Sequence, residues 1–333
     1  MNDTETPAVT IIVPVFKVAA LIGRCAESLF SQTFDDVEYI FVDDASPDES
    51  MEIMERVAAR HPERAGRIVK LRHETNRGLA AARLTGLQHA RGKYIMHVDS
   101  DDYLHTDAVK LMYEAVRKND ADAAVCDFEY VYTDYTRQYQ RTVAADVGKH
   151  VAALISKQSG SSIWGIMIRR ECATRPEALP IPGLNFGEDY ATTPRMLYFC
   201  HRIVHVPKTL YSYYKGPTSH ANWAGKEHCV YEIIQSHMTL KKFFAGRDRD
   251  FFADALQNSR ITCRWAALTL AVAGNMPDRV LLDITQQLPL DGMWKTSIGL
   301  HIKAALLFSH LRWWPFLRRM ISFYYFAKRV AKR

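Results

Sequence analysis

The chain has 333 residues, of which 48% are hydrophobic, enough for a sizeable core and comfortable for two domains. Its net charge of +6 comes from one segment, because residues 292–333 hold nine Lys or Arg and no Asp or Glu. The remaining 34 basic and 37 acidic side chains nearly balance, which argues against a general nucleic-acid binder.

The cysteines and the apolar runs indicate a cytoplasmic protein. The six cysteines are widely spaced, with no CxxC pair and no zinc-type cluster, as expected of buried thiols in a reducing compartment. The acidic and polar start, MNDTETPAV, does not resemble a secretory signal. The longest apolar stretch, 265–273, falls far short of the roughly 18 residues that a membrane span needs. We therefore expect a protein that is soluble, or that lies on a membrane without crossing it.

Strand-like and helix-like segments alternate through the first hundred residues. Residues 9–16 and 37–44 are nearly continuous apolar runs, typical of strands buried on both faces. Further strands are expected at 67–73 and 93–99, and helices at 18–32, 48–60 and 78–92. This alternation predicts an α/β fold with a mostly parallel sheet flanked by helices. Ligands of such sheets bind at the carboxyl ends of the strands.

The pattern continues for another hundred residues and then changes. Residues 183–200 are typical of a Gly-punctuated loop that turns into a helix at Glu188 and Asp189. From about residue 225 onward the pattern is almost entirely helical, so we place a domain boundary near 222–228. The other expected elements are a helix capped by Thr106 or Asp107 and strands within 123–133, 163–170 and 201–220.

An acidic cluster follows the predicted strand at 93–99. Asp99, Asp101 and Asp102 lie within four positions, and a second pair, Asp43 and Asp44, is expected at the same edge of the sheet. Hard cations such as Mg²⁺ and Mn²⁺ prefer oxygen ligands and keep positions open for phosphate. A solvated turn or a helix cap accounts for the same spacing, so the spacing alone leaves both readings open. An EF-hand is excluded because its Gly and Glu are missing.

Five segments together resemble the family 2 inverting glycosyltransferases, which have the GT-A nucleotide-diphospho-sugar transferase fold. In chain order they are VTIIVPVFK, EYIFVDDASPDES, NRGLAAARLTGL, GKYIMHVDSDD and FGEDY, within residues 8–220. The resemblance implies a GT-A catalytic domain at 1–224, followed by an all-α extension at 225–333. The donor half would be about 8–102 and the acceptor half about 103–224.

The resemblance also implies a nucleotide site along the strand ends. Asp44 would accept a hydrogen bond from the base, and Arg83 would face the nucleotide or its diphosphate, although an exposed structural role for Arg83 stays open. Lys17 replaces the family's usual Asn and Ala45 its usual Gly, so these two positions depart from the pattern. The implied nucleotide-binding residues are Pro14, Val15, Phe16, Asp43, Asp44, Asn76, Arg83, Asp99 and Ser100.

A divalent cation, Mn²⁺ or Mg²⁺, is the implied cofactor. Asp101 would be its direct ligand, Asp99 would hold the ribose or a metal-bound water, and His220 is a further candidate ligand. Lys215 and Ser219 are candidates for the diphosphate, and each is equally typical of plain surface.

The segment FGEDY would supply the chemistry. Asp189 matches the base that takes the proton of the acceptor hydroxyl, with Glu188 as its neighbour. The alternative is that both acids merely stabilise a helix N-terminus.

The basic tail at 300–333 predicts a membrane contact. Pro315 suits the first turn of a second helix, in which Leu317, Ile321 and Tyr324 form an apolar stripe beside basic and aromatic residues. This composition is typical of a helix lying on anionic lipid. A helix packed on the catalytic domain, with solvated Lys and Arg, is the alternative.

The expected function is a metal-dependent, inverting, hexosyltransferase-like enzyme. It would move a sugar from a nucleotide-diphosphate donor, a UDP-sugar, to a hydroxyl of a glycan or lipid-linked acceptor, in cell-surface polysaccharide biosynthesis at the inner face of the membrane. A sugar nucleotidyltransferase would need a Gly-rich basic loop after the first strand, where the chain has PVFKVAAL. A non-catalytic, membrane-docked scaffold is the rival from another class, and the intact Asp99, Asp101 and Asp189 count against it.

Overall fold

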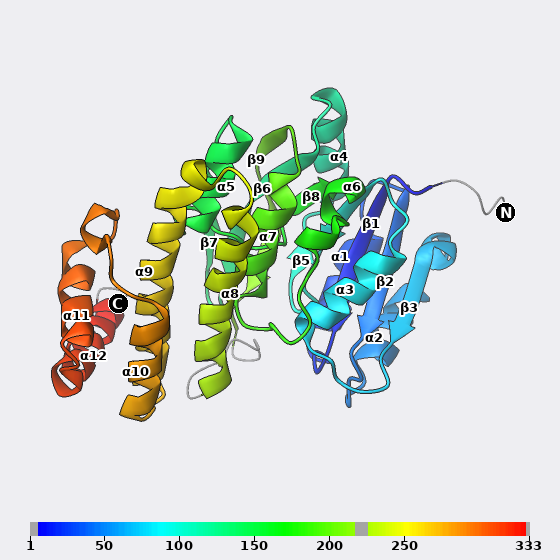
Figure 1. Cartoon of the computed structure of the whole chain (residues 1–333). Coiled ribbons are helices and arrows are strands. Elements are labelled where there is room, and N and C mark those ends of the chain that lie inside the picture. Colours follow the sequence, from blue (N-terminus) through cyan, green and yellow to red (C-terminus); the bar gives the residue numbers. More distant parts are fainter. Residues whose placement is uncertain (1–5, 217–225, 331–333) are drawn as a thin grey trace. The chain divides into compact units, whose positions relative to one another are not determined.

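The computed structural model describes residues 6–216 and 226–330, and it divides into two units (Figure 1). The first unit comprises residues 1–151 and 160–220, and the second comprises 152–159 and 221–333. The division after residue 220 lies close to the boundary expected near 222–228. Because residues 217–225 are outside the described part, the end of the catalytic domain stays a prediction.

Within the described residues, the first unit holds one sheet of nine strands. Their order is β3-β2-β1-β4-β8-β6-β9-β5, with β7 paired to β6. The strands β3, β2, β1 and β4 are parallel, whereas β8, β5 and β7 run antiparallel to their neighbours. The strands are β1 (Val9–Val15), β2 (Val37–Asp43), β3 (Ile68–Arg72), β4 (Tyr94–His97), β5 (Tyr103–Leu104), β6 (Ala123–Val131), β7 (Thr136–Tyr139), β8 (Ile166–Arg169) and β9 (Ile203–Tyr214).

Helices cover both faces of this sheet (Figure 1). The helices α1, α2 and α4 share one apolar cluster with the odd-numbered residues of β1, and α3 packs on the other face of β1 and β2. Gly86 lies so close to Ile12 that a Cβ there would collide with its side chain, so α3 approaches the sheet closely. The helices are α1 (Ile22–Phe30), α2 (Ser50–Ala58), α3 (Leu79–His89), α4 (Ala108–Lys118), α5 (Val147–Ile155), α6 (Arg170–Ala173) and α7 (Glu188–Tyr198), with 3₁₀ turns η1 (Pro62–Arg67) and η2 (Pro176–Ala178).

Every residue of β1 and β2 is buried, which explains their continuous apolar runs. Their parallel register sets Val15 beside Asp43, and β4 pairs with the other side of β1. The carboxyl ends of β1, β2 and β4 therefore meet at one edge of the sheet. The predicted α/β class, with a GT-A type sheet and an all-α extension, is confirmed.

The elements that sequence reasoning missed are short. The two-residue β5 and the exposed β7 bury little apolar surface, and α5 and α6 lie in the mixed region 134–182. Through β8 and β5, the second half of the sheet is mixed rather than parallel.

The second unit is helical. Arg264, which is 1% exposed, donates hydrogen bonds to Ser309 Oγ at 2.7 Å and to the carbonyl of Leu288 at 2.8 Å, and so ties α9 to the end of α10 and to α11. No helix in the described residues is long and apolar enough to cross a membrane. The helices are α8 (Glu227–Ala245), α9 (Arg249–Ala273), α10 (Asp278–Gln287), α11 (Leu300–His310) and α12 (Trp314–Val330), with a 3₁₀ turn η3 (Met293–Lys295).

Candidate active site

Arg83 is the centre of the site. Its guanidinium, on α3, is 1% exposed and contacts three carboxylates from two other parts of the chain. Nη2 donates to Asp99 Oδ1 at 2.5 Å, while Nη1 donates to Asp189 Oδ1 at 2.6 Å and also to Glu188. One buried cation thus joins the acidic cluster after β4 to the first turn of α7.

Burial and mutual repulsion decide the charges in this group. Burial opposes the charge of Arg83, but Glu188, Asp99 and Asp189 outweigh it and raise the pKa of Arg83 well above its ordinary value. Burial, with the nearby Asp189 added, raises the pKa of Glu188 well above its usual range despite Arg83. Glu188 therefore holds a proton more readily than an ordinary glutamate. The side chain of Asp189 is 27% exposed, against 5% for Glu188, so Asp189 is the carboxylate open to a substrate.

The loop before α7 holds the N-terminus of this helix against the start of α3. Gly187 has φ of 81°, a left-handed conformation that lets the loop turn directly into the helix at Glu188. Asn185 Oδ1 accepts a hydrogen bond from Ala80 N at 3.3 Å, in the first turn of α3. A side chain at Gly78 would collide with Asn185, so the loop and α3 approach closely only because residue 78 is glycine.

The loop after β4 is fixed to β9. Asp102 Oδ2 accepts a hydrogen bond from the Tyr211 hydroxyl at 2.6 Å, and Asp102 Oδ1 accepts one from Tyr214 N at 2.8 Å. Burial, Asp101 and Asp99 together raise the pKa of Asp102 well above its usual range. Asp102 therefore holds a proton more readily than an ordinary aspartate, and its two hydrogen bonds fix the loop that carries Asp99 and Asp101.

The carboxylates of Asp99 and Asp101 fit a hard divalent cation. Among the described residues there is no group of three or more His, Cys, Asp or Glu arranged to hold a metal ion. A cation would therefore have Asp99 and Asp101 from the described chain, which suits ions that take one or two carboxylates and complete their shell with phosphate and water. His220, the third predicted ligand, lies outside the described residues, as does Ser219.

Asp44 organises a loop. Its Oδ1 accepts hydrogen bonds from His73 Nδ1 at 2.6 Å and Arg77 N at 2.8 Å, and its Oδ2 accepts from Asn76 Nδ2 at 2.9 Å and Gly78 N at 2.8 Å. Each carboxylate oxygen of Asp44 therefore accepts two hydrogen bonds, which is the usual capacity of such an oxygen. Asp44 and Asn76 therefore shape the turn before α3, and their contacts with a nucleotide stay predictions.

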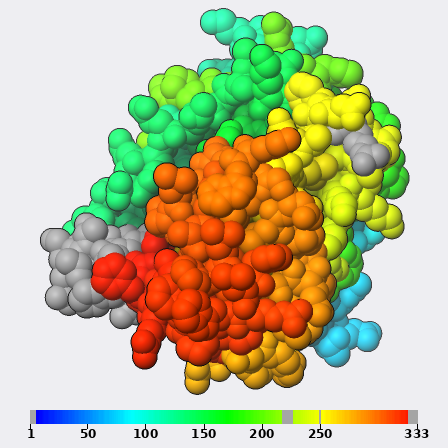
Figure 2. Space-filling model, turned by 60° about the vertical axis from the view of Figure 1, so that its left-hand side comes forward, coloured from blue at the N-terminus to red at the C-terminus, as the bar shows by residue number. Residues whose placement is uncertain are grey.

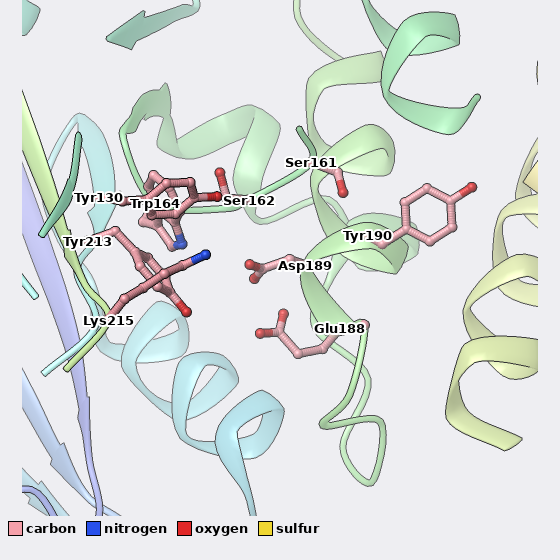
Figure 3. Close-up of a pocket in the computed structure, with 10 residues that line it drawn as sticks. Tyr130, Ser161, Ser162, Trp164, Glu188, Asp189, Tyr190, Tyr213 and Lys215 are labelled. Atoms are coloured by element: carbon pink, nitrogen blue, oxygen red, sulfur yellow. The ribbon is translucent and has the colours of Figure 1, made fainter. Parts of the chain in front are cut away.

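A cavity opens beside α7. It has a volume of about 360 Å³, and Figure 3 shows that Asp189 and Glu188 face several polar side-chain ends across it. Its lining residues are Tyr130, Ser161, Ser162, Trp164, Gly187, Glu188, Asp189, Tyr190, Tyr213 and Lys215. The cavity has the size and the mixed apolar and polar lining of a small-molecule site.

A family model described as glycosyl transferase family 2 matches residues 10–171. Residues 10–171 form a domain of this family. The matched segment runs from β1 to α6 and includes Arg83 and the acidic cluster.

A curated relative agrees with the family 2 assignment, and two solved structures share the fold. An uncharacterized glycosyltransferase, EpsJ of Bacillus subtilis, is 32% identical over 221 residues, which cover 64% of this chain and 62% of EpsJ. The chain thus spans less than two thirds of that relative's length. TarS of S. aureus, solved as residues 1–349 with UDP-GlcNAc, has a TM-score of 0.71 at 18% identity, over 96% of this chain and 92% of TarS. A mannosyltransferase from Pyrobaculum calidifontis, solved with GDP-Man and Mn²⁺, has a TM-score of 0.50 at 20% identity, over 96% of this chain and 86% of the other.

Both departures from the family 2 pattern are in left-handed backbone. Lys17 has φ of 53° and Ala45 has φ of 55°, a region that Asn and Gly tolerate best. The two turns are joined, since Lys17 N donates to Ser46 Oγ at 2.8 Å. The family's Asn and Gly are therefore explained by backbone conformation at the ends of β1 and β2.

The other predicted nucleotide residues line the same sheet edge. Pro14 and Val15 end β1 and Phe16 follows it, while Asp43 ends β2 and Ser100 follows β4 in the acidic loop. Asp43 Oδ1 accepts a hydrogen bond from Ser46 N at 2.7 Å. Their contacts with a ligand stay predictions.

Sequence reasoning missed the aromatic wall of the cavity. Tyr130 and Tyr213 are opposite each other in the parallel pair β6–β9, as are Phe128 and Tyr211. The signal was present as aromatic residues at every second position of FEYVY and YSYY, which places them on one face of a strand.

Replacing Ala45 by Gly should stabilise the protein by about 0.5 to 1 kcal/mol, because relief of the left-handed strain outweighs the extra freedom of Gly in the unfolded chain. The control is Ala253→Gly, at an exposed alanine inside α9, where Gly should instead destabilise by about 0.5 to 1 kcal/mol. Urea unfolding gives the free energy of unfolding of both variants and of the parent protein. An equal loss of this free energy in the two variants would contradict the strain argument.

Replacing Arg83 by Met should lower the free energy of unfolding by about 3 to 5 kcal/mol at neutral pH, because buried carboxylates lose their only shared cation in this group. Arg83→Lys, which keeps a charge without the forked geometry, should lose less. The exposed Arg77→Met is the matched control and should change stability little. A loss for Arg83→Met no larger than for Arg77→Met would show that the ion pairs are not structural.

Proposed function

We propose that the chain is a metal-dependent, inverting glycosyltransferase that moves a sugar from a nucleotide-diphosphate donor, a UDP-sugar, to a hydroxyl of a glycan or lipid-linked acceptor. The observation that carries this proposal is the joining of Asp189 and Asp99 through Arg83. A candidate base and a candidate donor-binding carboxylate thereby share one site. Cell-surface polysaccharide biosynthesis is the proposed setting.

Asp189 acts as the general base in this proposal. It accepts the proton of the acceptor hydroxyl while the oxygen attacks the anomeric carbon from the face opposite the diphosphate. Arg83 fixes the orientation of the carboxylate through its bond to Oδ1. Glu188, the more deeply buried neighbour, also accepts a hydrogen bond from Arg83 and so helps to hold Arg83 beside Asp189.

Asp99 and Asp101 would hold the divalent cation. When bound, Mn²⁺ or Mg²⁺ neutralises the negative charge that develops on the departing diphosphate. The Mn²⁺ reported with the Pyrobaculum mannosyltransferase supports this proposal for the fold. The acidic loop, with Asp102 fixed to Tyr211, holds Asp99 and Asp101 in place from the protein side.

The donor is proposed to lie along the ends of β1, β2 and β4. UDP-GlcNAc in TarS supports a uridine nucleotide, whereas GDP-Man in the mannosyltransferase shows that the fold also serves guanine donors. Lys215, whose Nζ is 3.7 Å from the centroid of the Tyr130 ring, is the proposed cation near the diphosphate.

Two other functions would use the same fold. A sugar nucleotidyltransferase would need a Gly-rich basic loop after β1, and the turn there carries Phe16, Lys17 and Val18. A non-catalytic scaffold would have no use for a partly exposed carboxylate held by a buried cation, so Asp189 favours the enzyme.

Thermal stability tests the donor site directly. UDP with Mn²⁺, at about 100 times its dissociation constant, should add about 2.7 kcal/mol to the stability of the folded protein. Asp101→Ala should lose this gain, whereas Asp134→Ala, an exposed Asp, should keep it. Stabilisation by no nucleotide at all would favour the scaffold.

Transfer assays test the base. Asp189→Asn should lower kcat by about 10²- to 10⁴-fold and leave the UDP stabilisation unchanged, because only proton transfer is lost. Release of UDP from UDP-sugars in the presence of acceptor glycans is the measurement. A variant with full activity would exclude Asp189 as the base.

We also propose that α11 and α12 rest on the inner face of the cell membrane. The predicted stripe does not make this contact, since Leu317 and Ile321 are 0% exposed and pack within the second unit. Other apolar residues of α11, α12 and the turn that joins them are exposed instead. This is the part of the chain that Figure 2 colours orange and red. The exposed apolar residues are Leu300, Leu307, Leu311, Trp313, Phe316 and Phe323.

Charge supports an anionic lipid surface as the partner. Arg312 and Arg319 are exposed on the same segment, and residues 292–333 contain no acidic side chain. Exposed aromatic and apolar groups beside basic ones are typical of a segment lying in a membrane interface.

Vesicle flotation tests this surface. The protein should float with vesicles that contain anionic phospholipid and remain behind with purely zwitterionic ones. Trp313→Ala combined with Phe323→Ser should abolish flotation, whereas Phe251→Ala, at an exposed aromatic of α9, should not. Flotation that is equal for all three proteins would exclude α11 and α12 as the contact.

A further inference from the structure

We propose that the cavity beside α7 is the subsite for a neutral pyranose ring of the acceptor, which packs against the wall formed by Tyr130 and Tyr213 and presents a hydroxyl to Asp189. This inference rests on the proposed function and names the ligand of that site more closely. It assigns the cavity to the acceptor and not to the donor.

The wall is a rigid aromatic surface. The rings of Tyr130 and Tyr213 are 5.5 Å apart and nearly perpendicular, and Trp164 lies 5.3 Å from Tyr213. Trp164 is in turn stacked on the fully buried Tyr211 at 4.5 Å. These rings come from β6, β9 and the segment before β8, so the sheet sets their positions.

A half-buried arginine holds the back of this wall. Arg141 lies 4.8 Å from the Trp164 ring centroid, and its Nη2 donates to Ser162 Oγ at 2.7 Å and to the Trp164 carbonyl at 3.1 Å. Since Ser162 Oγ accepts from Arg141, its own hydroxyl proton is directed elsewhere. Ser162 lines the cavity, so a ligand oxygen is a suitable acceptor for it.

The two sides of the cavity complement a sugar. Figure 3 shows the indole nitrogen of Trp164, the Tyr213 hydroxyl and the Lys215 ammonium on one side, with Asp189 and Glu188 opposite. A pyranose has apolar C–H faces, which pack on aromatic rings, and a rim of hydroxyls, which bond to such groups. Hydroxyl donors on one edge would meet the carboxylates while acceptor oxygens on the other would meet the N–H and O–H groups.

The lining favours the acceptor over the donor. Asp189 lines the cavity, whereas Asp43, Asp44, Asp99 and Asp101 do not, and of the described residues proposed for the donor Lys215 alone lines it. In the transfer, the acceptor O–H proton passes to the Asp189 carboxylate and the oxygen forms the new bond to the anomeric carbon. The anomeric carbon–phosphate oxygen bond breaks, and its electron pair leaves with the nucleoside diphosphate. The hydroxyl that reacts must therefore be beside Asp189.

Saturation-transfer-difference NMR with methyl β-D-glucopyranoside and methyl β-N-acetylglucosaminide tests this subsite on the full chain. The ring C–H protons should receive the strongest saturation, and the signal should persist when a non-hydrolysable UDP-sugar and Mn²⁺ are bound. Tyr213→Leu and Tyr130→Leu should each reduce the signal at least fivefold. Tyr135→Ala, at a tyrosine that is 59% exposed and stacked on Tyr132 outside the cavity, should keep it.

Three results would overturn the inference. Absence of saturation in the parent protein would exclude this wall. So would a signal in Tyr213→Leu and Tyr130→Leu that equals the signal of the parent protein. Displacement of the pyranosides by the UDP-sugar analogue would assign the cavity to the donor sugar. UDP stabilisation, measured on the same samples, separates the two proposals: if it persists while the pyranosides fail, only the acceptor subsite falls.

Discussion

The site depends on one buried guanidinium among three carboxylates. Arg83 is 1% exposed, and a charge in that position is tolerated only because Asp99, Glu188 and Asp189 surround it. The same cation fixes the carboxylates, which come from the loop after β4 and from α7. Separation of these segments would leave unpaired buried charges on both. The burial of these charges costs free energy, but their mutual attraction also holds the two segments together.

The backbone before α3 positions Arg83 for its ion pairs. Asp44 gathers the side chains of His73 and Asn76 with the amides of Arg77 and Gly78, so the turn before α3 has one geometry. From that turn α3 delivers Arg83 to the carboxylates. A polar network with every member bonded is rigid, whereas one that is partly bonded is a liability. The end of β2 thus acts on the site through α3.

The nearly continuous apolar runs predicted β1 and β2, because strands buried on both faces are almost wholly apolar, and the strand ends then located the acids. Two buried exceptions, Thr10 and Glu38, are hydrogen-bonded to each other at 2.7 Å. The sequence did not predict that Arg83 would be buried, because its helix, rich in alanine, has no clear polar face and its three partners are far along the chain. The stripe at Leu317 and Ile321 was identified correctly, but an apolar stripe looks the same whether it contacts lipid or α9. Tertiary packing decides such cases.

The two halves of the sheet use different physical means. Parallel strands end together, and their loops collect carboxylates, amides and left-handed turns at Lys17 and Ala45, which suit the charged, metal-bound donor that we propose. The mixed half brings β6 and β9 side by side, and the register of Tyr130 with Tyr213 builds a surface of rings. Recognition of the donor by charge depends on loop conformations that most substitutions would disturb. Recognition of a neutral ring depends on the identity of a few exposed side chains, and those can change without disturbing the sheet. Acceptor choice is therefore the property that this fold leaves easiest to alter.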